Sequence, residues 1–219
     1  MALAADLPLS VFKNLVQRND FVREKASLQL KLLFEKHSER LTTEAFADYM
    51  NSLMNTIYEL LRSPKTKDNL AGVLAIDALL QADTSSHEVK IVKLANHLRL
   101  ILQHASDSDI LILASAALGR LARTGGNLNH TVIEFELGRA LEWLKAGDND
   151  HLLSAILILK NIAENAPSTF FQHVDAFIEY IDVALQAPKD IVRENAAAAL
   201  GSCLTMISQR EPAERERWY

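Results

Sequence analysis

The side chains that could do chemistry are few in this chain, and their spacing favours structural roles. His97 and His104 are seven residues apart, which places them on one face of a helix, and Asp107 follows shortly after. This spacing is more typical of chance neighbours on a solvated helix end than of a metal site. The segment 148–150, Asp-Asn-Asp, opens like a calcium loop but lacks the glycine and the closing glutamate of that motif, so we expect a helix cap there.

Other candidate catalytic groups have equally ordinary interpretations. Gly125-Gly126 is followed by neither the lysine nor the serine of a phosphate-binding loop, and we expect it to end a helix. Cys203 lies on an apolar stripe, which is typical of a small buried side chain. Asp175 and Glu179 are spaced as acids commonly are on a solvated helix face. The sequence predicts no catalytic residue, metal site or cofactor site, and an enzyme site formed between helices is the alternative that it leaves open.

The composition excludes several classes of protein. The chain has 219 residues with seven glycines and five prolines, about half the share found in typical globular proteins. A β-sandwich or barrel needs a turn about every ten residues, and a dinucleotide or P-loop domain needs clustered glycines, so both are disfavoured. A net charge of -5 without any long basic run disfavours a nucleic-acid-binding protein.

Targeting features point to the cytoplasm. A single cysteine cannot form an internal disulfide, which favours a reducing compartment. The first six residues carry no basic group ahead of their apolar ones, unlike a secretory signal peptide. The longest apolar runs, such as 110–114, are far shorter than the roughly 18 residues that span a bilayer. We therefore expect a cytoplasmic segment without membrane insertion.

Hydrophobic periodicity predicts an all-α fold made of ten helices in series. The expected N-terminal caps are Asp20, Thr42 or Thr43, Ser85, Asp107 or Ser108, Thr131, Asp148 or Asp150, Ser168 and Asp190. The expected helices cover residues 8–18, 20–38, 43–62, 69–81, 85–102, 108–124, 131–147, 150–166, 168–188 and 190–209. The short connections between them are typical of antiparallel neighbours.

A repeated pattern groups these helices into pairs. In every second helix a small residue recurs at an inward position; these residues are Ala26, Ala75, Ala114, Ala155 and Ala196. A period near 40 residues with two helices per unit is typical of HEAT-type repeats, which stack into a right-handed superhelix. The sequence thus predicts one α-α solenoid of the HEAT or armadillo type over residues 1–219. Its five or so helical pairs are expected to cover 8–40, 42–82, 85–124, 131–166 and 168–209.

The same pattern predicts how the pairs contact each other. Small side chains let two helix backbones approach closely, so the alanines are expected between helices. Arg23 and Arg193, each one residue after an inward valine, are expected to pair with an acid in the adjacent repeat. Each pair leaves an apolar flank that only a further pair can bury. Because Trp218 and Tyr219 stand at the end of the array, we expect the segment to be cut from a longer solenoid there.

Several stretches are more specific than a generic repeat. They are 132–136 (Val-Ile-Glu-Phe-Glu), 139–144 (Arg-Ala-Leu-Glu-Trp-Leu), 168–172 (Ser-Thr-Phe-Phe-Gln), 188–194 (Pro-Lys-Asp-Ile-Val-Arg-Glu), 209–212 (Gln-Arg-Glu-Pro) and Trp218-Tyr219. Together they resemble the N-terminal HEAT region of the target of rapamycin (TOR) serine/threonine protein kinases. The resemblance covers most of the chain and is strongest from about Asn69 onward.

The resemblance implies a regulatory and scaffolding segment of a very large kinase whose catalytic domain lies outside these residues. In that family, which acts in growth and nutrient signalling, the N-terminal solenoid helps to assemble complexes with a Raptor-type or Rictor-type scaffold and with other parts of the TOR chain. It also offers a docking surface to a Rheb-type small GTPase, whose binding shifts the solenoid and realigns the kinase. The resemblance places the parent complex at a lysosomal, vacuolar or other endomembrane surface.

A docking surface for such a GTPase is expected on the helix over residues 43–62. Its polar residues Asn51, Ser52, Asn55 and Thr56 alternate with inward apolar ones, which gives this early repeat a polar outward face. We expect these four residues to bind a protein partner. The alternative function is that of a free-standing HEAT or armadillo adaptor, such as a transport or phosphatase scaffold.

Overall fold

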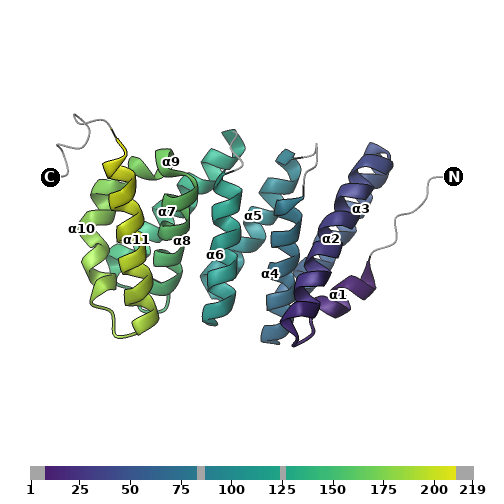
Figure 1. Ribbon diagram of the computed structural model, residues 1–219, viewed down its shortest axis with the longest axis horizontal. Helices are drawn as coiled ribbons and strands as arrows, with labels where there is room; N and C mark the ends of the chain where they lie inside the picture. The colour runs from purple at the N-terminus through teal and green to yellow at the C-terminus, as the bar shows by residue number, and fades with distance from the viewer. Residues whose placement is uncertain (1–7, 83–86, 124–126, 211–219) are drawn as a thin grey trace. The chain divides into compact units, whose positions relative to one another are not determined.

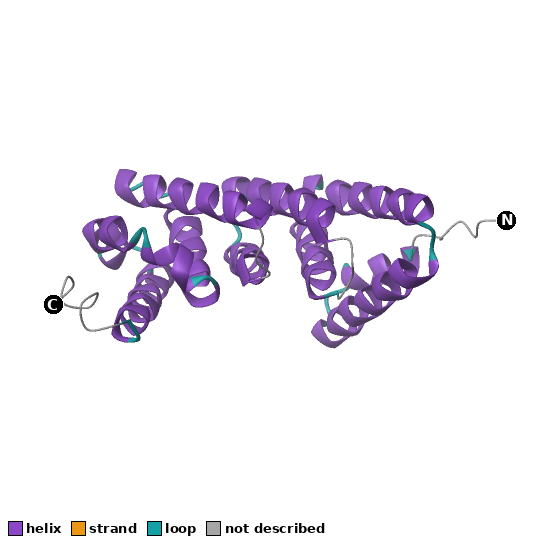
Figure 2. Ribbon diagram, turned by 90° about the horizontal axis from the view of Figure 1, so that it is seen from above, coloured by secondary structure: helices purple, strands orange, loops and turns teal. Residues whose placement is uncertain are grey.

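Helix is the only regular secondary structure in the residues that the computed structural model describes, which are 8–82, 87–123 and 127–210 (Figures 1 and 2). The helices are α1 (Leu9–Leu15), α2 (Asp20–Arg40), α3 (Thr43–Arg62), α4 (Thr66–Gln81), α5 (His87–His104), α6 (Ser108–Arg123), α7 (Asn127–Ala146), α8 (Leu152–Asn165), α9 (Pro167–Phe171), α10 (Val174–Leu185) and α11 (Asp190–Ser208). The predicted all-α class is confirmed. The chain forms two compact units, Met1–Ile101 and Leu102–Tyr219.

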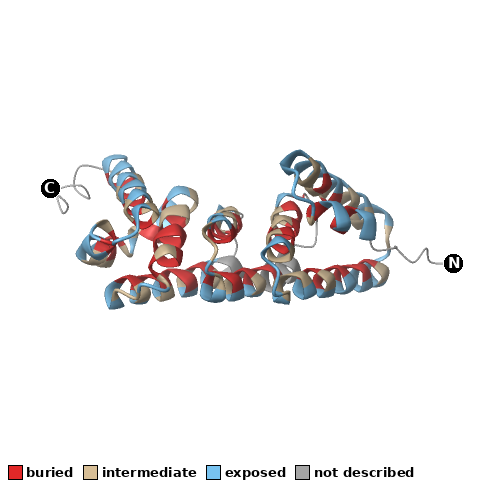
Figure 3. Cartoon of the chain, turned by 90° about the horizontal axis from the view of Figure 1, so that it is seen from below, coloured by how far each residue is buried: buried red, intermediate tan, exposed pale blue. Residues whose placement is uncertain are grey.

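In the first unit, α2 packs against both α1 and α4, and α3 packs against α4. The interior is formed by large, fully buried side chains, among them Leu15 of α1, Leu30 and Phe34 of α2, and Leu53 of α3. The ring of Phe34 meets that of Phe46 of α3 with centroids 5.4 Å apart. Burial of such side chains, at about 1.5–3 kcal/mol each, is the main favourable term that holds these helices together. Figure 3 shows buried positions turned toward neighbouring helices and exposed positions turned away.

In the second unit, α8 packs against both α6 and α11, while α7 packs on α8 and α10 packs on α11. The stretch 156–159 of α8, Ile-Leu-Ile-Leu, is buried at every position. A helix that is apolar on all sides in this way needs neighbours on all sides, and α8 has them in α6, α7, α9 and α11.

All five small residues of the predicted register are fully buried, which confirms the register. They lie on α2, α4, α6, α8 and α11, the helices that stack on one another within each unit. Gly119 of α6 adds a further close approach, because a Cβ there would lie 2.8 Å from Nδ2 of Asn165 and 3.1 Å from the backbone oxygen of Asn161. Small side chains therefore set the distance between stacked helices.

The helix caps agree with the predictions at some helices and differ at others. Thr42 and Asp107 each accept a hydrogen bond from the backbone N–H three residues on, as predicted. At α2 the capping side chain is Asn19 and not Asp20, because the backbone is extended at Asn19 and its Oδ1 accepts a bond of 3.2 Å from the first turn. At α11 no side chain caps the helix, and Asp190 lies inside the first turn.

At α7 and α9 the residue predicted as the N-terminal cap lies inside the helix. Helix α7 begins at Asn127, so Thr131 lies inside it and its capping-box pattern marks no start. Helix α9 begins at Pro167, one residue before the predicted cap Ser168, because the fixed φ of proline suits the first helical position. The predicted cap Ser85 and the predicted helix end at Gly125-Gly126 lie outside the described residues.

Helix α4 begins at Thr66, three residues before its predicted start. Asn69 lies in the first turn and serves the preceding helix. Its Nδ2 donates to the carbonyl oxygens of Leu60 and Leu61 at 3.0 Å and to that of Ser63 at 2.9 Å. The side chain thus satisfies carbonyl groups that the end of α3 leaves without helical partners.

The helix predicted over 168–188 is two helices, because α9 ends at Phe171 and α10 begins at Val174. Phe170 and Phe177 are both fully buried, and their ring centroids are 5.3 Å apart. On one continuous helix, residues seven apart are separated by about 10 Å along the axis. The break after Phe171 lets both rings enter the same core.

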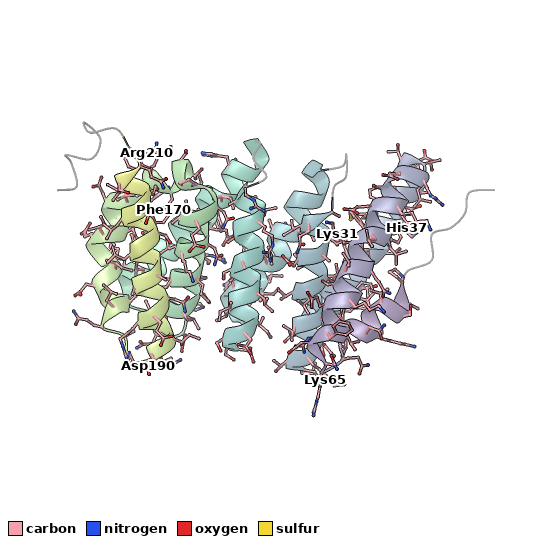
Figure 4. The ribbon with its side chains drawn as sticks, in the orientation of Figure 1. Lys31, His37, Lys65, Phe170, Asp190 and Arg210 are labelled. Atoms are coloured by element: carbon pink, nitrogen blue, oxygen red, sulfur yellow. The ribbon has the colours of Figure 1, made fainter. Side chains whose placement is uncertain are left out.

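The predicted pairing of Arg23 and Arg193 with an adjacent repeat is wrong. Each guanidinium pairs with the aspartate at the start of its own helix, Asp20 or Asp190. Each also donates to a carbonyl of the connection before its helix, at 2.7 Å for Arg193 and 3.4 Å for Arg23. An arginine three residues into a helix lies within reach of that helix's own start, which Figure 4 marks at Asp190 for α11.

Candidate interaction surfaces

The four residues predicted to bind a partner lie on the outward side of α3. Asn51, Ser52 and Asn55 are exposed and Thr56 is half-buried, whereas the positions between them, 53, 54 and 57, are buried. The Ser52 and Thr56 hydroxyls each donate to the backbone carbonyl four residues earlier, at 3.0 and 3.1 Å. The predicted exposure is confirmed for Asn51, Ser52 and Asn55, and the binding role of the four residues stays a prediction.

The same face continues to two residues that sequence reasoning missed. Tyr58 and Arg62 follow Asn51 at i+7 and i+11, a spacing that keeps all three on one side of α3. Nη1 of Arg62 donates to the Tyr58 hydroxyl at 2.8 Å, and its guanidinium lies 5.3 Å from the centre of the Tyr58 ring. Tyrosine and arginine are enriched at the energetic centres of protein interfaces. We call the six residues Asn51, Ser52, Asn55, Thr56, Tyr58 and Arg62 the α3 face.

A pair of rings, the buried Tyr49 and the half-buried His37, lies beneath the α3 face. Tyr49 of α3 meets His37 of α2 edge-on, with ring centroids 4.6 Å apart. Burial raises the pKa of Tyr49 to about 12. Burial, and secondarily the charge of Lys36, lowers the pKa of His37. Both rings are therefore uncharged at neutral pH, and the α3 face stands on an apolar base.

His97 and Asp107, which are candidate metal ligands in the sequence together with His104, serve separate local roles. His97 meets the Tyr58 ring edge-on at 5.6 Å, and Asp107 caps α6. Within the described residues, no three or more His, Cys, Asp or Glu side chains are grouped so as to hold a metal ion. Among the helices of the described ranges, none is long and apolar enough to cross a membrane.

The loop 148–150 is organised by the histidine that follows it. His151 Nδ1 lies 2.7 Å from Oδ2 of Asp148, and its Nε2 lies 3.0 Å from the carbonyl oxygen of Gln103. Its ring stacks on Trp143 with centroids 4.5 Å apart. The hydrogen bond from His151, together with one from the backbone N–H of Asp150, lowers the pKa of Asp148. The loop is thus a compact hydrogen-bonded turn.

The predicted cap at this loop is wrong in detail, because α8 begins only at Leu152 and has no side-chain cap. Beside the loop lies a cleft of about 220 Å³, with His104, Asp150 and Lys189 among its lining residues. Small-molecule sites usually enclose about 300–1,000 Å³ and are largely apolar. The size and mixed charge of this cleft therefore do not favour a ligand site.

The remaining candidate groups have the structural roles that the sequence predicts. Cys203 is fully buried, and burial raises the pKa of its thiol to about 11. A thiol held in its protonated form is a poor nucleophile. Asp175 and Glu179 are exposed on α10.

The helices form repeated pairs, and each of the stacked helices α2, α4, α6, α8 and α11 carries a fully buried alanine. The class of protein with this architecture is the helical-repeat protein. The chain is homologous to a segment of the TOR serine/threonine-protein kinases, the family that its sequence resembles. Serine/threonine-protein kinase TOR of Arabidopsis thaliana is 37% identical over 193 residues, 86% of this chain, and that of Oryza sativa subsp. japonica is 40% identical over 187 residues, 84% of this chain. TOR2 of Saccharomyces cerevisiae is 34% identical over 215 residues, 92% of this chain. The chain spans only 8–9% of the length of these relatives.

No family model matches the sequence. Among solved structures, an engineered protein is 18% identical with a TM-score of 0.45, over 90% of this chain and 78% of that chain. A designed armadillo repeat protein is 16% identical with a TM-score of 0.40, over 89% of this chain and 98% of that chain.

Proposed function

We propose that this chain is a non-catalytic scaffolding segment of a TOR-type serine/threonine protein kinase, and that its exposed helix faces assemble the parent complex. The homology to a segment of TOR kinases favours this function over that of a free-standing adaptor. In this proposal the kinase activity belongs to the remainder of the parent protein. The partners are a Raptor-type or Rictor-type scaffold and other parts of the TOR chain, and the complex works in the cytoplasm at an endomembrane surface.

We further propose that the α3 face docks a Rheb-type small GTPase. The observation that carries this proposal is a row of exposed polar side chains, ending in the Tyr58–Arg62 pair, on a helix whose inner side is fully buried. A face supported in this way is pre-organised, so binding costs little ordering of the backbone. In the proposal, docking at α3 shifts neighbouring helical pairs and so acts on the kinase at a distance.

The test introduces negative charge into the α3 face. We expect the double variant Asn51→Glu with Asn55→Glu, in the full-length parent, to lose capture by the GTP-loaded GTPase. The matched control is Gln29→Glu on the exposed side of α2, which should bind like the unmodified protein. Unchanged capture by the α3 variant would refute the docking site. Complex assembly is tested separately. The same variant is purified, and the measurement is whether the scaffold subunit co-purifies with it.

A further inference from the structure

Helix α2 carries an apolar stripe on its outward side. Phe21, Leu28 and Leu32 are 73%, 55% and 55% exposed. Their i, i+7, i+11 spacing keeps them within an arc of about 40° around the helix. No other helix in the described part of the chain exposes three large apolar side chains. We call these three residues the α2 stripe.

The known neighbours of α2 lie on its other sides. The inner row of Ala26, Leu30 and Phe34 is fully buried. Phe34 meets α3, and Ser27 donates from its hydroxyl to the carbonyl oxygen of Leu74 in α4 at 3.3 Å. The α2 stripe is turned by about 120–160° from Ala26, so α2 is apolar on two opposite faces and only one of them is covered.

The charged residues beside the α2 stripe are basic on one edge and acidic on the other. Lys25 and Lys36 are exposed along one edge, and neither forms an ion pair within the described residues. The other edge carries Glu24 and Glu35, and Glu35 lies 3.9 Å from Lys31. Coiled coils use the same arrangement: the apolar seam packs against the partner helix, and the charged edges determine which helix binds and in which direction.

We propose that the α2 stripe docks an amphipathic helix of a protein partner whose apolar seam is bordered by acidic residues on the edge that meets Lys25 and Lys36. Exposed apolar side chains in a row with the spacing of a helix seam fit another helix. The two free lysines select an acidic edge by charge complementarity. An anionic membrane fits less well, because Glu24 and Glu39 flank the stripe and would face the lipid headgroups. This surface is separate from the α3 face and does not depend on it.

The test uses a synthetic helical peptide of about 20 residues. It carries leucines at the spacing of the α2 stripe and glutamates along one edge, and a second peptide has lysines in place of those glutamates. We expect the intact chain to bind the acidic-edge peptide more tightly, by fluorescence anisotropy. Leu28→Gln with Leu32→Gln should weaken that binding by about tenfold or more. Lys25→Glu with Lys36→Glu should reverse the preference between the two peptides.

The matched control is Leu204→Gln on α11, another half-exposed leucine, which should leave peptide binding unchanged. All substituted positions are exposed, so we expect each variant to keep its helices. Far-UV circular dichroism of each variant checks this. Equal binding of both peptides, or insensitivity to the Leu28 and Leu32 changes, would overturn the proposal. So would binding to phosphatidylserine vesicles together with no binding to the acidic-edge peptide, which would identify the α2 stripe as a lipid-binding surface.

Discussion

Helices α2 and α11 begin with nearly the same residues, Asp20 to Glu24 and Asp190 to Glu194, yet they are packed differently beyond that start. Both place an arginine back onto the aspartate of their own first turn, and both bury the alanine three residues after the arginine. Further along, equivalent positions diverge: Leu30 is fully buried, whereas its counterpart Leu200 is half-buried. The comparison separates what the local motif determines from what the neighbours of each helix determine.

The largest expected difference between the two helices is at these leucines. Leu30→Ala should cost about 2–5 kcal/mol of stability, because it leaves a cavity among fully buried side chains. Leu200→Ala should cost about 1 kcal/mol, because part of that side chain already contacts water. Urea unfolding, with amide hydrogen exchange to assign the loss to a helix, measures both. Equal costs would mean that the repeat motif, and not the surroundings, sets the packing.

Those leucines also show how far the sequence predicts this fold. Periodicity and the spacing of small residues predict the class, most helix positions and the burial of all five alanines, because these follow from the chain alone. Burial of a given side chain depends on which helices lie beside it, so Leu30 and Leu200 could not be told apart. For the same reason Tyr58 and Arg62 were missed, since their pairing depends on side-chain geometry across two helical turns.

A smaller effect is expected from enlarging the buried alanine. Ala196→Leu should destabilise by about 1–3 kcal/mol, because α11 and α8 stack closely there and the larger side chain must displace them. Ala197→Leu, one residue on and exposed, should change stability by less than about 0.5 kcal/mol. Thermal unfolding followed by circular dichroism distinguishes the two variants. A destabilisation of similar size by Ala197→Leu would contradict the assigned register.

Substitutions of the two arginines in the shared motif should differ less in their cost to stability. Arg193→Ala removes hydrogen bonds of 2.7 and 3.0 Å to the carbonyls of Ala187 and Pro188, and we expect a cost of about 1 kcal/mol. Arg23→Ala removes a single bond of 3.4 Å, and should cost about 0.5 kcal/mol or less. Each variant also loses the ion pair with the aspartate at the start of its own helix. Urea midpoints of the two variants compare them directly. A larger loss of stability for Arg23→Ala would show that the lengths of the hydrogen bonds do not determine which arginine contributes more.

The smallest effect is a dependence on pH that only α2 should have. His37 occupies the position where α11 has the buried Ile207, and burial lowers the pKa of His37. Below a pH of about 6.5 the unfolded chain takes up a proton at His37 more readily than the folded chain, so stability falls as the pH falls through that range. The second cause, the charge of Lys36, acts in the same direction.

His37→Leu should therefore flatten the decline in stability of the first unit between about pH 6.5 and pH 5, because a leucine takes up no proton. Hydrogen exchange of α2 and α3 amides at several pH values, corrected for the intrinsic exchange rate, measures the slope. The amides of α11 serve as the internal control and should keep the same slope in both proteins. If the stability of α2 declines equally in the variant, another group in the first unit titrates, and the His37–Tyr49 pair is not what distinguishes α2 from α11.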